Sequence, residues 1–351
     1  MATTLEFGIF DWLEHRDNEP LHQIFEQRLQ MLEFADENGF YAYHLAEHQG
    51  TPLSLNNAPS VVIASAIQRT TRLRLIPTTY CLPWYNPLRL YNEICMLDQY
   101  SQGRLEVGIG RGVSPIESTY FGLYDIEASR ELYREMLDIL LYAFTHDELS
   151  YEGKHFQYKG VELYNKPYQK PYPPLWYPTH NIESVPYMAG HGFNTSHNFA
   201  PNDVAKKHFE LFREQYEVDK DDPNRINAHV AAPRIANTRH IYVGDSDERA
   251  VAEARPAFDV WADHISYLSG RFADRPRDSL TLESRMNNET ALVGSPDTIR
   301  RKIDDMVAET GINYFLGVFN FGNLPQERVI HSLDLFAREV MPAYAGVAAV
   351  P

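Results

Sequence analysis

The chain has 351 residues, of which 44% are hydrophobic and 23% are charged, a composition typical of a globular protein with a large core. Its length allows two domains or one α/β barrel. The 32 basic and 48 acidic residues give a formal net charge of −16, which argues against nucleic acid or an anionic membrane surface as a partner.

Strand-like and helix-like patterns alternate through the first half of the chain. Short apolar strands are expected at residues 5–10, 40–45, 73–78 and 105–109. The first helix opens at Asn18 and Pro20 and closes at Gly39. Further helices are expected at 58–68, 87–100 and 129–144.

The alternation continues through the second half. Strands are expected at 175–178, 193–196, 235–243 and 313–319. Helices are expected at 184–190, 203–217, 247–268 and 325–340, and one more runs from the Ser295-Pro296-Asp297 cap to Gly311. About eight strand–helix units favour an α/β fold of the (β/α)8 TIM-barrel type over a doubly wound sheet.

The chain is longer than the roughly 250 residues that such a barrel needs, and the excess lies in two segments. Residues 146–172 are rich in aromatic residues, proline and glycine and alternate like a hairpin. Residues 270–292 are charged and polar, with the weak periodicity of a loop. We therefore expect one TIM-barrel domain over residues 1–351 with two insertions.

The candidate site residues follow the strands, because chemistry in a TIM barrel lies where strands end. His44 to His48 matches the HxxEH zinc motif, which needs a helix that places both histidines on one face. An aromatic strand precedes this stretch and residues 49–52, Gln-Gly-Thr-Pro, follow it, so a helix and a zinc site are disfavoured. His44 is expected in the core, and His48, beside Glu47, is the catalytic candidate.

A glycine–arginine turn ends the fourth expected strand. The glycines on both sides of Arg111 let the backbone approach a ligand, and its guanidinium suits phosphate or carboxylate. Taken alone, such a turn is more often only a strand end. Arg130, at the start of the next helix, and Asn181 with Ser184, at the start of the helix after the fifth strand, would complete a phosphate site. A solvated helix face is the stronger alternative for Arg130, and plain capping is an equal alternative for Ser184.

Aromatic residues near the strand ends suggest a pocket for a flat apolar ligand. Trp12, Tyr80 and Trp84 would line it, although aromatic residues at such positions are more often core. Cys81 and Cys95 are the only cysteines and lack zinc spacing. The chain shows neither a signal-peptide pattern nor an apolar run that could span a bilayer, so a cytoplasmic protein with reduced thiols is expected.

Four stretches of the chain resemble the bacterial luciferase-like flavin monooxygenases. They are residues 43–48, 97–112, 293–296 and 336–342. The segment 98–112 is the most specific of them, and the resemblance extends from Phe7 to about Tyr344.

The resemblance implies a barrel that binds reduced FMN supplied by a separate reductase. Oxygen would add to the flavin, and the resulting flavin peroxide would oxidise a small organic substrate. His48 matches the active-site histidine, which would hydrogen-bond to or deprotonate the reacting group. Thr78 and Thr79 match a strand end that often carries a non-proline cis peptide against the flavin ring. The other positions assigned to the cofactor site are Glu47, Arg111, Arg130, His180, Asn181 and Ser184.

Three departures separate the chain from light-emitting members of that family. Gln49 stands where those members have a second histidine, Gly110 where they have a reactive cysteine, and His180 at an acidic position of the phosphate loop. Bioluminescence is therefore not expected. A deazaflavin-dependent dehydrogenase and a non-catalytic flavin-binding protein remain the alternatives. The family resemblance also implies a homodimer through the helices at 58–68 and 87–100.

Overall fold

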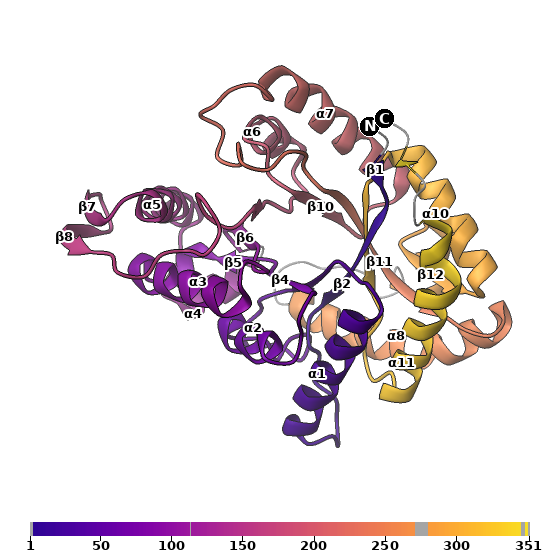
Figure 1. The fold of residues 1–351 in the computed structure, drawn as a ribbon. Helices are drawn as coiled ribbons and strands as arrows, with labels where there is room; N and C mark the ends of the chain where they lie inside the picture. Colours follow the sequence, from indigo (N-terminus) through magenta and orange to yellow (C-terminus); the bar gives the residue numbers. More distant parts are fainter. Residues whose placement is uncertain (1–2, 113, 271–279, 345–347, 350–351) are drawn as a thin grey trace.

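Within the residues that the computed structural model describes (3–112, 114–270, 280–344 and 348–349), eight parallel strands form a closed ring. The predicted barrel is therefore confirmed (Figure 1). The strands are β2 (Glu6–Asp11), β3 (Ala42–Leu45), β4 (Arg74–Pro77), β6 (Val107–Gly110), β9 (Leu175–Trp176), β10 (Thr195–Asn198), β11 (Ile235–Val243) and β13 (Tyr314–Val318).

Parallel pairing brings all eight carboxyl ends to one side of the ring. β2 pairs with β3 and β13, β3 pairs with β4, and β11 pairs with β10 and β13. β6 pairs with β9, and two single bridges complete the ring. One joins Leu75 of β4 to Leu105, just before β6, and the other joins Trp176 of β9 to Asn194, just before β10. We call the side formed by the loops after these strands the barrel mouth, since the chemistry of this fold lies there.

Helices connect successive strands on the outside of the ring (Figure 1). Asn86 caps the helix at Pro87–Ser101 by accepting a hydrogen bond from the Arg89 N–H at 3.1 Å. Gly311, with a φ of 66°, ends the helix at Pro296–Thr310. The main helices are α1 (Leu21–Glu37), α2 (Pro59–Ile67), α3 (Pro87–Ser101), α5 (Ile126–Thr145), α6 (Val185–Gly190), α7 (Asn202–Asp219), α8 (Asp247–Gly270), α10 (Pro296–Thr310) and α11 (Gln326–Leu335).

The region between β6 and α5 differs from the sequence prediction. A short helix, α4 (Pro115–Tyr120), was missed, because six residues are too few for a clear apolar period. The predicted start of α5 was also late, since Asp125 caps the helix by accepting the Glu127 N–H at 2.9 Å. Arg130 consequently lies inside α5 rather than at its first turn.

The two predicted insertions have different outcomes. Residues 146–172 contain an antiparallel hairpin of β7 (Glu148–Glu152) and β8 (Gln157–Glu162), which projects beyond α5 at the left of Figure 1. Residues 271–279 of the second insertion lie outside the described residues. The loop prediction is wrong for the rest of it, because Thr281 caps α9 (Leu282–Asn287) and β12 (Ala291–Gly294) pairs with the end of β11.

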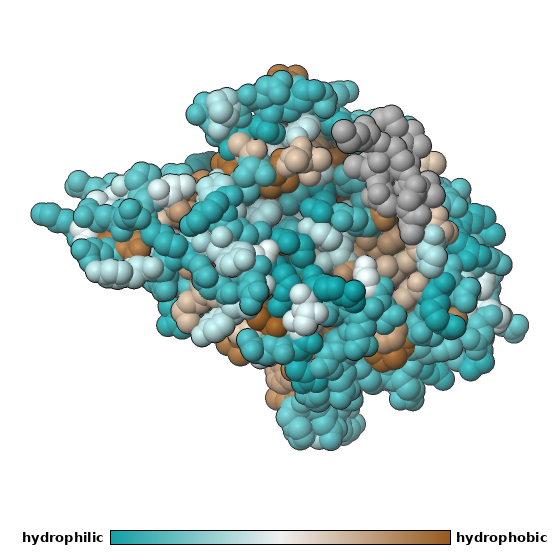
Figure 2. Space-filling view, viewed as in Figure 1, coloured by the Kyte–Doolittle hydropathy of each residue, from teal (hydrophilic) through white to brown (hydrophobic). Residues whose placement is uncertain are grey.

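The surface has the character expected of an acidic globular chain. The face in Figure 2 is mostly hydrophilic, with apolar side chains in small separate areas. No helix in the described part of the chain has the length and apolarity to cross a membrane. Both cysteines, Cys81 and Cys95, are buried and free.

Candidate functional site

The loops of the barrel mouth carry most of the residues that the sequence indicated. Trp12 follows β2, His48 follows β3, and the Thr78-Thr79 pair follows β4. Arg111 follows β6, and His180 follows β9. Because neighbouring strands pair in this order, these side chains come from adjacent parts of one edge.

His48 is held by a buried carboxylate that sequence reasoning missed. Its Nδ1 lies 3.2 Å from Oε2 of Glu117, a residue of α4 that is 1% exposed. Glu117 also accepts the Gln49 N–H at 2.5 Å. A carboxylate can only accept hydrogen bonds, so the neutral imidazole carries its proton on Nδ1 and presents Nε2 as a base.

A sequence signal for Glu117 existed but had two possible meanings. Ser114 and Glu117 have the spacing of a capping box, and Ser114 does cap α4. In a capping box the glutamate would bond back to the cap residue. Here its carboxylate turns instead to the loop after β3, which only tertiary structure decides.

The zinc motif between His44 and His48 is not formed. His44 lies in β3, with Nδ1 2.9 Å from the Thr78 hydroxyl and Nε2 3.0 Å from the Tyr314 hydroxyl. Burial lowers the pKa of His44 to about 3, so this histidine is a neutral core residue, as predicted. Among the described residues, no group of three histidine, cysteine, aspartate or glutamate side chains could hold a metal.

Glu47 is a buried acid that directly precedes His48 in the sequence, but its hydrogen bonds go to other residues. Its oxygens accept the Cys81 N–H at 3.0 Å and the Tyr85 hydroxyl at 2.7 Å. Burial raises the pKa of Glu47 to about 7, with a smaller opposing effect from these hydrogen bonds. Glu47 thus fastens the segment after β4 and can exchange a proton near neutral pH.

The backbone beside β4 and β6 is unusually close-packed. The Thr78–Thr79 peptide bond is cis, as the family resemblance implied. Glycine leaves room opposite it, because a Cβ at Gly110 would lie 2.5 Å from the Thr79 hydroxyl oxygen. At Gly108 a Cβ would lie 2.4 Å from the Pro77 carbonyl oxygen. This edge therefore presents bare backbone with little side-chain cover.

The predicted phosphate residues are not all equally available. Arg111 is half-buried and forms no hydrogen bond or ion pair with the described residues. Arg130 is half-exposed on α5 and pairs with Glu127, which supports the solvated-face alternative. Asn181 is exposed and uses its side chain to accept the Glu183 N–H at 3.1 Å. Ser184 is half-buried at the start of α6, and its side chain caps nothing.

His180 lies at the exposed end of a histidine row. Its ring centre is 5.1 Å from that of His197 on β10, which in turn is 4.3 Å from that of His208 on α7. Burial lowers the pKa of His197 to about 3, so the interior of this row is uncharged.

The three predicted pocket residues divide into two groups. Trp84 stacks on Phe121 with ring centres 5.0 Å apart, and the Tyr80 hydroxyl lies 2.9 Å from that of Ser60. Trp12 belongs to the opposite side of the mouth, where it stacks on Phe199 at 5.4 Å. The contacts of Trp12 are thus separate from those of Tyr80 and Trp84, and a shared pocket stays a prediction.

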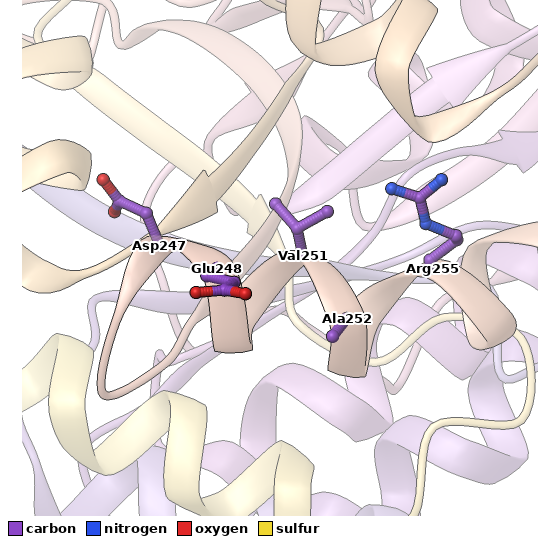
Figure 3. A pocket seen from close by; sticks show the side chains of 5 residues that line it. All are labelled: Asp247, Glu248, Val251, Ala252 and Arg255. Carbon is purple, nitrogen blue, oxygen red and sulfur yellow. The ribbon is translucent and has the colours of Figure 1, made fainter.

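A shallow hollow elsewhere on the molecule is a weaker candidate. Its lining residues come from the first turns of α8, as Figure 3 shows. Asp247 there bonds to the Ser295 N–H at 2.7 Å and to the Thr298 hydroxyl at 2.9 Å, so it joins α8 to α10. The other lining residues are Glu248, Val251, Ala252 and Arg255. No predicted site residue lies in this hollow, and we place the candidate site at the barrel mouth.

Comparison with known proteins gives a consistent picture. Residues 5–314 match the model of a family described as luciferase-like monooxygenase. An uncharacterised protein of Sinorhizobium fredii, y4wF, is 36% identical over 97% of this chain and 98% of its own length. The oxygenase component of the flavin-dependent trigonelline monooxygenase of Acinetobacter baylyi is 24% identical, over 97% of this chain and 96% of its own.

Solved structures show the same fold. The monooxygenase RslO1 of Streptomyces bottropensis superposes with a TM-score of 0.84 at 25% identity, over 97% of this chain and all of that one. The oxygenating constituent of 3,6-diketocamphane monooxygenase of Pseudomonas putida, in complex with FMN, gives a TM-score of 0.79 at 22% identity. That match covers 96% of this chain and 98% of the Pseudomonas chain.

Proposed function

The chain belongs to the luciferase-like monooxygenase family, and we propose that it is an FMN-dependent monooxygenase that oxidises a small organic substrate. The observation that carries the proposal is His48, a basic imidazole fixed at the barrel mouth by the buried carboxylate of Glu117. Members of the family named above are monooxygenases, and one was solved with FMN.

The residues of the mouth fit a flavin. The bare backbone at Gly108 and Gly110, opposite the cis Thr78–Thr79 peptide, offers a side-chain-free surface for a flat ring. Arg111 is a cation at the same edge that pairs with no carboxylate of the described residues, so its guanidinium suits a phosphate. When bound and reduced, FMN supplies the electrons that activate oxygen.

We assign separate roles to the residues around this surface. Arg111 and the backbone N–H groups near Ser184 bind the phosphate, with His180 beside them. Thr78 and Thr79 support the ring. Arg130 and Asn181 contribute less, since Glu127 and the Glu183 N–H already engage their side chains.

His48 is the proton-handling group of the proposed reaction. Its Nε2 accepts a proton from the substrate side and returns it later, and imidazole is suited to this near neutral pH. Glu117 is a positioning residue, because it holds Nδ1 in the protonated form and stabilises the imidazolium. Glu47 acts indirectly by anchoring the Cys81 backbone and Tyr85.

The proposal includes a partner and an assembly. One relative is named as an oxygenase component, so we propose that a separate reductase supplies reduced FMN here as well. We treat residues 1–351 as one domain. Apolar side chains exposed on α2 and α3, namely Val61, Met96 and Tyr100, support a homodimer through those helices. The free buried thiols of Cys81 and Cys95 suit a cytoplasmic location.

Anaerobic titration with reduced FMN tests the proposal directly. We expect saturable binding, and product formation from a panel of small cyclic ketones and terpenes only when both reduced FMN and oxygen are present. Absence of FMN binding would refute the proposal. Tight binding of a deazaflavin coenzyme with oxygen-independent hydride transfer would replace it by the dehydrogenase alternative.

A further inference from the structure

A buried histidine with no hydrogen-bond partner lies at the barrel mouth, apart from the residues assigned above. His240 lies on β11, where it pairs in register with Val318, the last residue of β13. Its side chain is 1% exposed, and neither Nδ1 nor Nε2 has a partner within the described structure. An unpartnered buried polar group costs free energy, so its retention calls for an explanation.

A second unpartnered donor lies beside it. The ring of Trp261, from α8, has its centre 4.1 Å from that of His240, and its Nε1 is also buried without a partner. Two donors on adjacent rings can converge on one acceptor atom. Trp261 can only donate, so a group that satisfies both must be a hydrogen-bond acceptor.

Aromatic rings surround this pair of donors. Phe199 and Trp12, which stack on each other, have ring centres 4.8 and 5.8 Å from that of His240. Phe258 and Phe321 approach it at 5.2 and 5.5 Å. We call His240, Trp261 and these four residues the aromatic box. Burial among these rings would cost a charged group far more hydration free energy than it would cost the oxygen of an uncharged carbonyl compound.

The entrance to the aromatic box is conformationally strained. Phe199 has a φ of 55° and Leu13, which follows Trp12, has a φ of 61°. Non-glycine residues rarely adopt this left-handed region, and such strain gathers at ligand-binding sites. Phe199 is one of the two rings stacked beside His240, and Leu13 follows the other, Trp12. Strain at these positions suits a cover that a ligand displaces.

We propose that the aromatic box binds the substrate, and that His240 and Trp261 hold the carbonyl oxygen of an uncharged, otherwise apolar ring compound. The inference rests on the proposed function and deepens it by naming the substrate class. The polar side of the mouth then holds the cofactor. The carbonyl compound lies on the β11 side, across the barrel from the proposed flavin surface at the ends of β4 and β6.

The test compares two ligands of matched shape on the purified protein without flavin. Cyclohexanone presents a carbonyl oxygen where methylenecyclohexane presents a CH2 group. Saturation-transfer NMR and titration of tryptophan fluorescence measure both affinities. We expect roughly tenfold tighter binding of cyclohexanone, the value of one to two net hydrogen bonds.

Two variants locate the contact, and one serves as a control. His240→Phe keeps the ring shape and removes both nitrogens, and Trp261→Phe removes only the indole donor. Each should reduce the preference for cyclohexanone to about two- to threefold or less. His229→Phe is the matched control, because His229 also has a buried unpartnered Nε2 but precedes β11 at the other end of the barrel. It should keep the full preference.

Equal binding of the two ligands by the wild-type protein would overturn the inference. So would an unchanged preference in a folded His240→Phe or Trp261→Phe protein, with folding checked by circular dichroism. If one variant does not fold, the other decides. Tighter binding of cyclohexanecarboxylate than of cyclohexanone would also contradict the uncharged class. Because no flavin is present, failure here is separate from failure of the FMN titration.

Discussion

The two sides of the barrel mouth hold a histidine in opposite ways. After β3, β4 and β6, His48 is paired with the buried Glu117, and the backbone beside Gly110 is bare. After β2 and β10 and within β11, aromatic rings enclose a histidine whose nitrogens are unpaired. One edge of parallel strands thus provides a preorganised polar surface and an apolar enclosure, and the difference suggests a division between cofactor and substrate.

Each side also contains one histidine–glutamate pair. His264 of α8 donates from Nδ1 to Glu14 at 2.6 Å, and Glu14 also accepts the Gly322 N–H at 2.9 Å. The histidines are 12% and 14% exposed and both glutamates are 1% exposed, so the two pairs are closely matched. Glu14 joins the loops after β2 and β13 to α8, which is a structural task. Glu117 holds a histidine beside the proposed flavin surface.

Replacing the two histidines by glutamine should separate these tasks. Glutamine can still donate to the carboxylate but has no basic nitrogen. We expect His48→Gln to lower turnover by about 10²- to 10⁴-fold, as loss of a general base does. His264→Gln should change turnover by less than about threefold while thermal unfolding shows a folded protein. Equal losses of kcat in both variants would remove the distinction between the pairs.

The buried acid on the polar side should make stability depend on pH. The pKa of Glu47 is raised from its ordinary 4.5 to about 7, so the folded protein keeps a proton that the unfolded chain releases. Stability contributed by the protonated form is lost as pH rises from about 4.5 to about 7, by a total of about 3 kcal/mol. Glu47→Gln should abolish this loss.

Urea unfolding at pH 5 and pH 8 measures the Glu47 effect. The difference in unfolding free energy, Glu47→Gln minus wild type, should be about 2.5 kcal/mol more favourable to the variant at pH 8 than at pH 5. A constant difference between the two proteins across this range would show that the Glu47 carboxyl titrates at its ordinary pKa in the folded state.

The two arginines of the predicted phosphate site should differ in their effect on FMN. Arg111→Ala removes a guanidinium that has no carboxylate partner in the described structure, and we expect FMN affinity to fall roughly 30- to 100-fold. Arg130→Ala disturbs an exposed pair with Glu127, and its effect should stay below about threefold. Riboflavin, which lacks the phosphate, should bind wild type and Arg111→Ala alike. A larger effect from Arg130 would reverse our assignment.

A methyl group at Gly110 is the smallest change to the polar side. Its carbon would lie 2.5 Å from the Thr79 hydroxyl, so we expect Gly110→Ala to cost about 1 to 2 kcal/mol in unfolding free energy. The double variant Gly110→Ala with Thr79→Ser removes the Thr79 methyl and leaves the hydroxyl free to turn. It should recover part of the loss, and a neutral Gly110→Ala would show that the edge can move apart.

The sequence was sufficient for the features that local patterns determine. Eight alternating units predicted the barrel, because strand and helix periods are visible within short windows. Strand ends then indicated His48, Arg111 and Thr78-Thr79. Glu117 is 69 positions from His48, and Glu14 is 250 positions from His264, so neither pairing leaves a local signal. The start of α5 was predicted at residue 129 because the Asp125 cap was overlooked, so Arg130 lies further inside the helix than expected.

The aromatic side of the mouth is also built from distant segments, whose contacts leave no local signal in the sequence. Trp12 was correctly taken as a residue of the mouth, but its partners Phe199 and His240 arrive from β10 and β11. His240 lies within a nine-residue strand whose members are all buried, and a histidine there looks like any core residue. Only the register of β11 against β13 places it level with the mouth.

Strands near the two ends of the sequence form an antiparallel pair, in which Thr3 pairs with Ala349 and Thr4 with Ala348. β1 (Thr3–Thr4) leads into the amino end of β2, so this junction lies at the far end of the barrel from the mouth. An affinity tag or a fused reductase attached at the junction would leave the mouth unobstructed. The junction is therefore a suitable point for immobilising the protein.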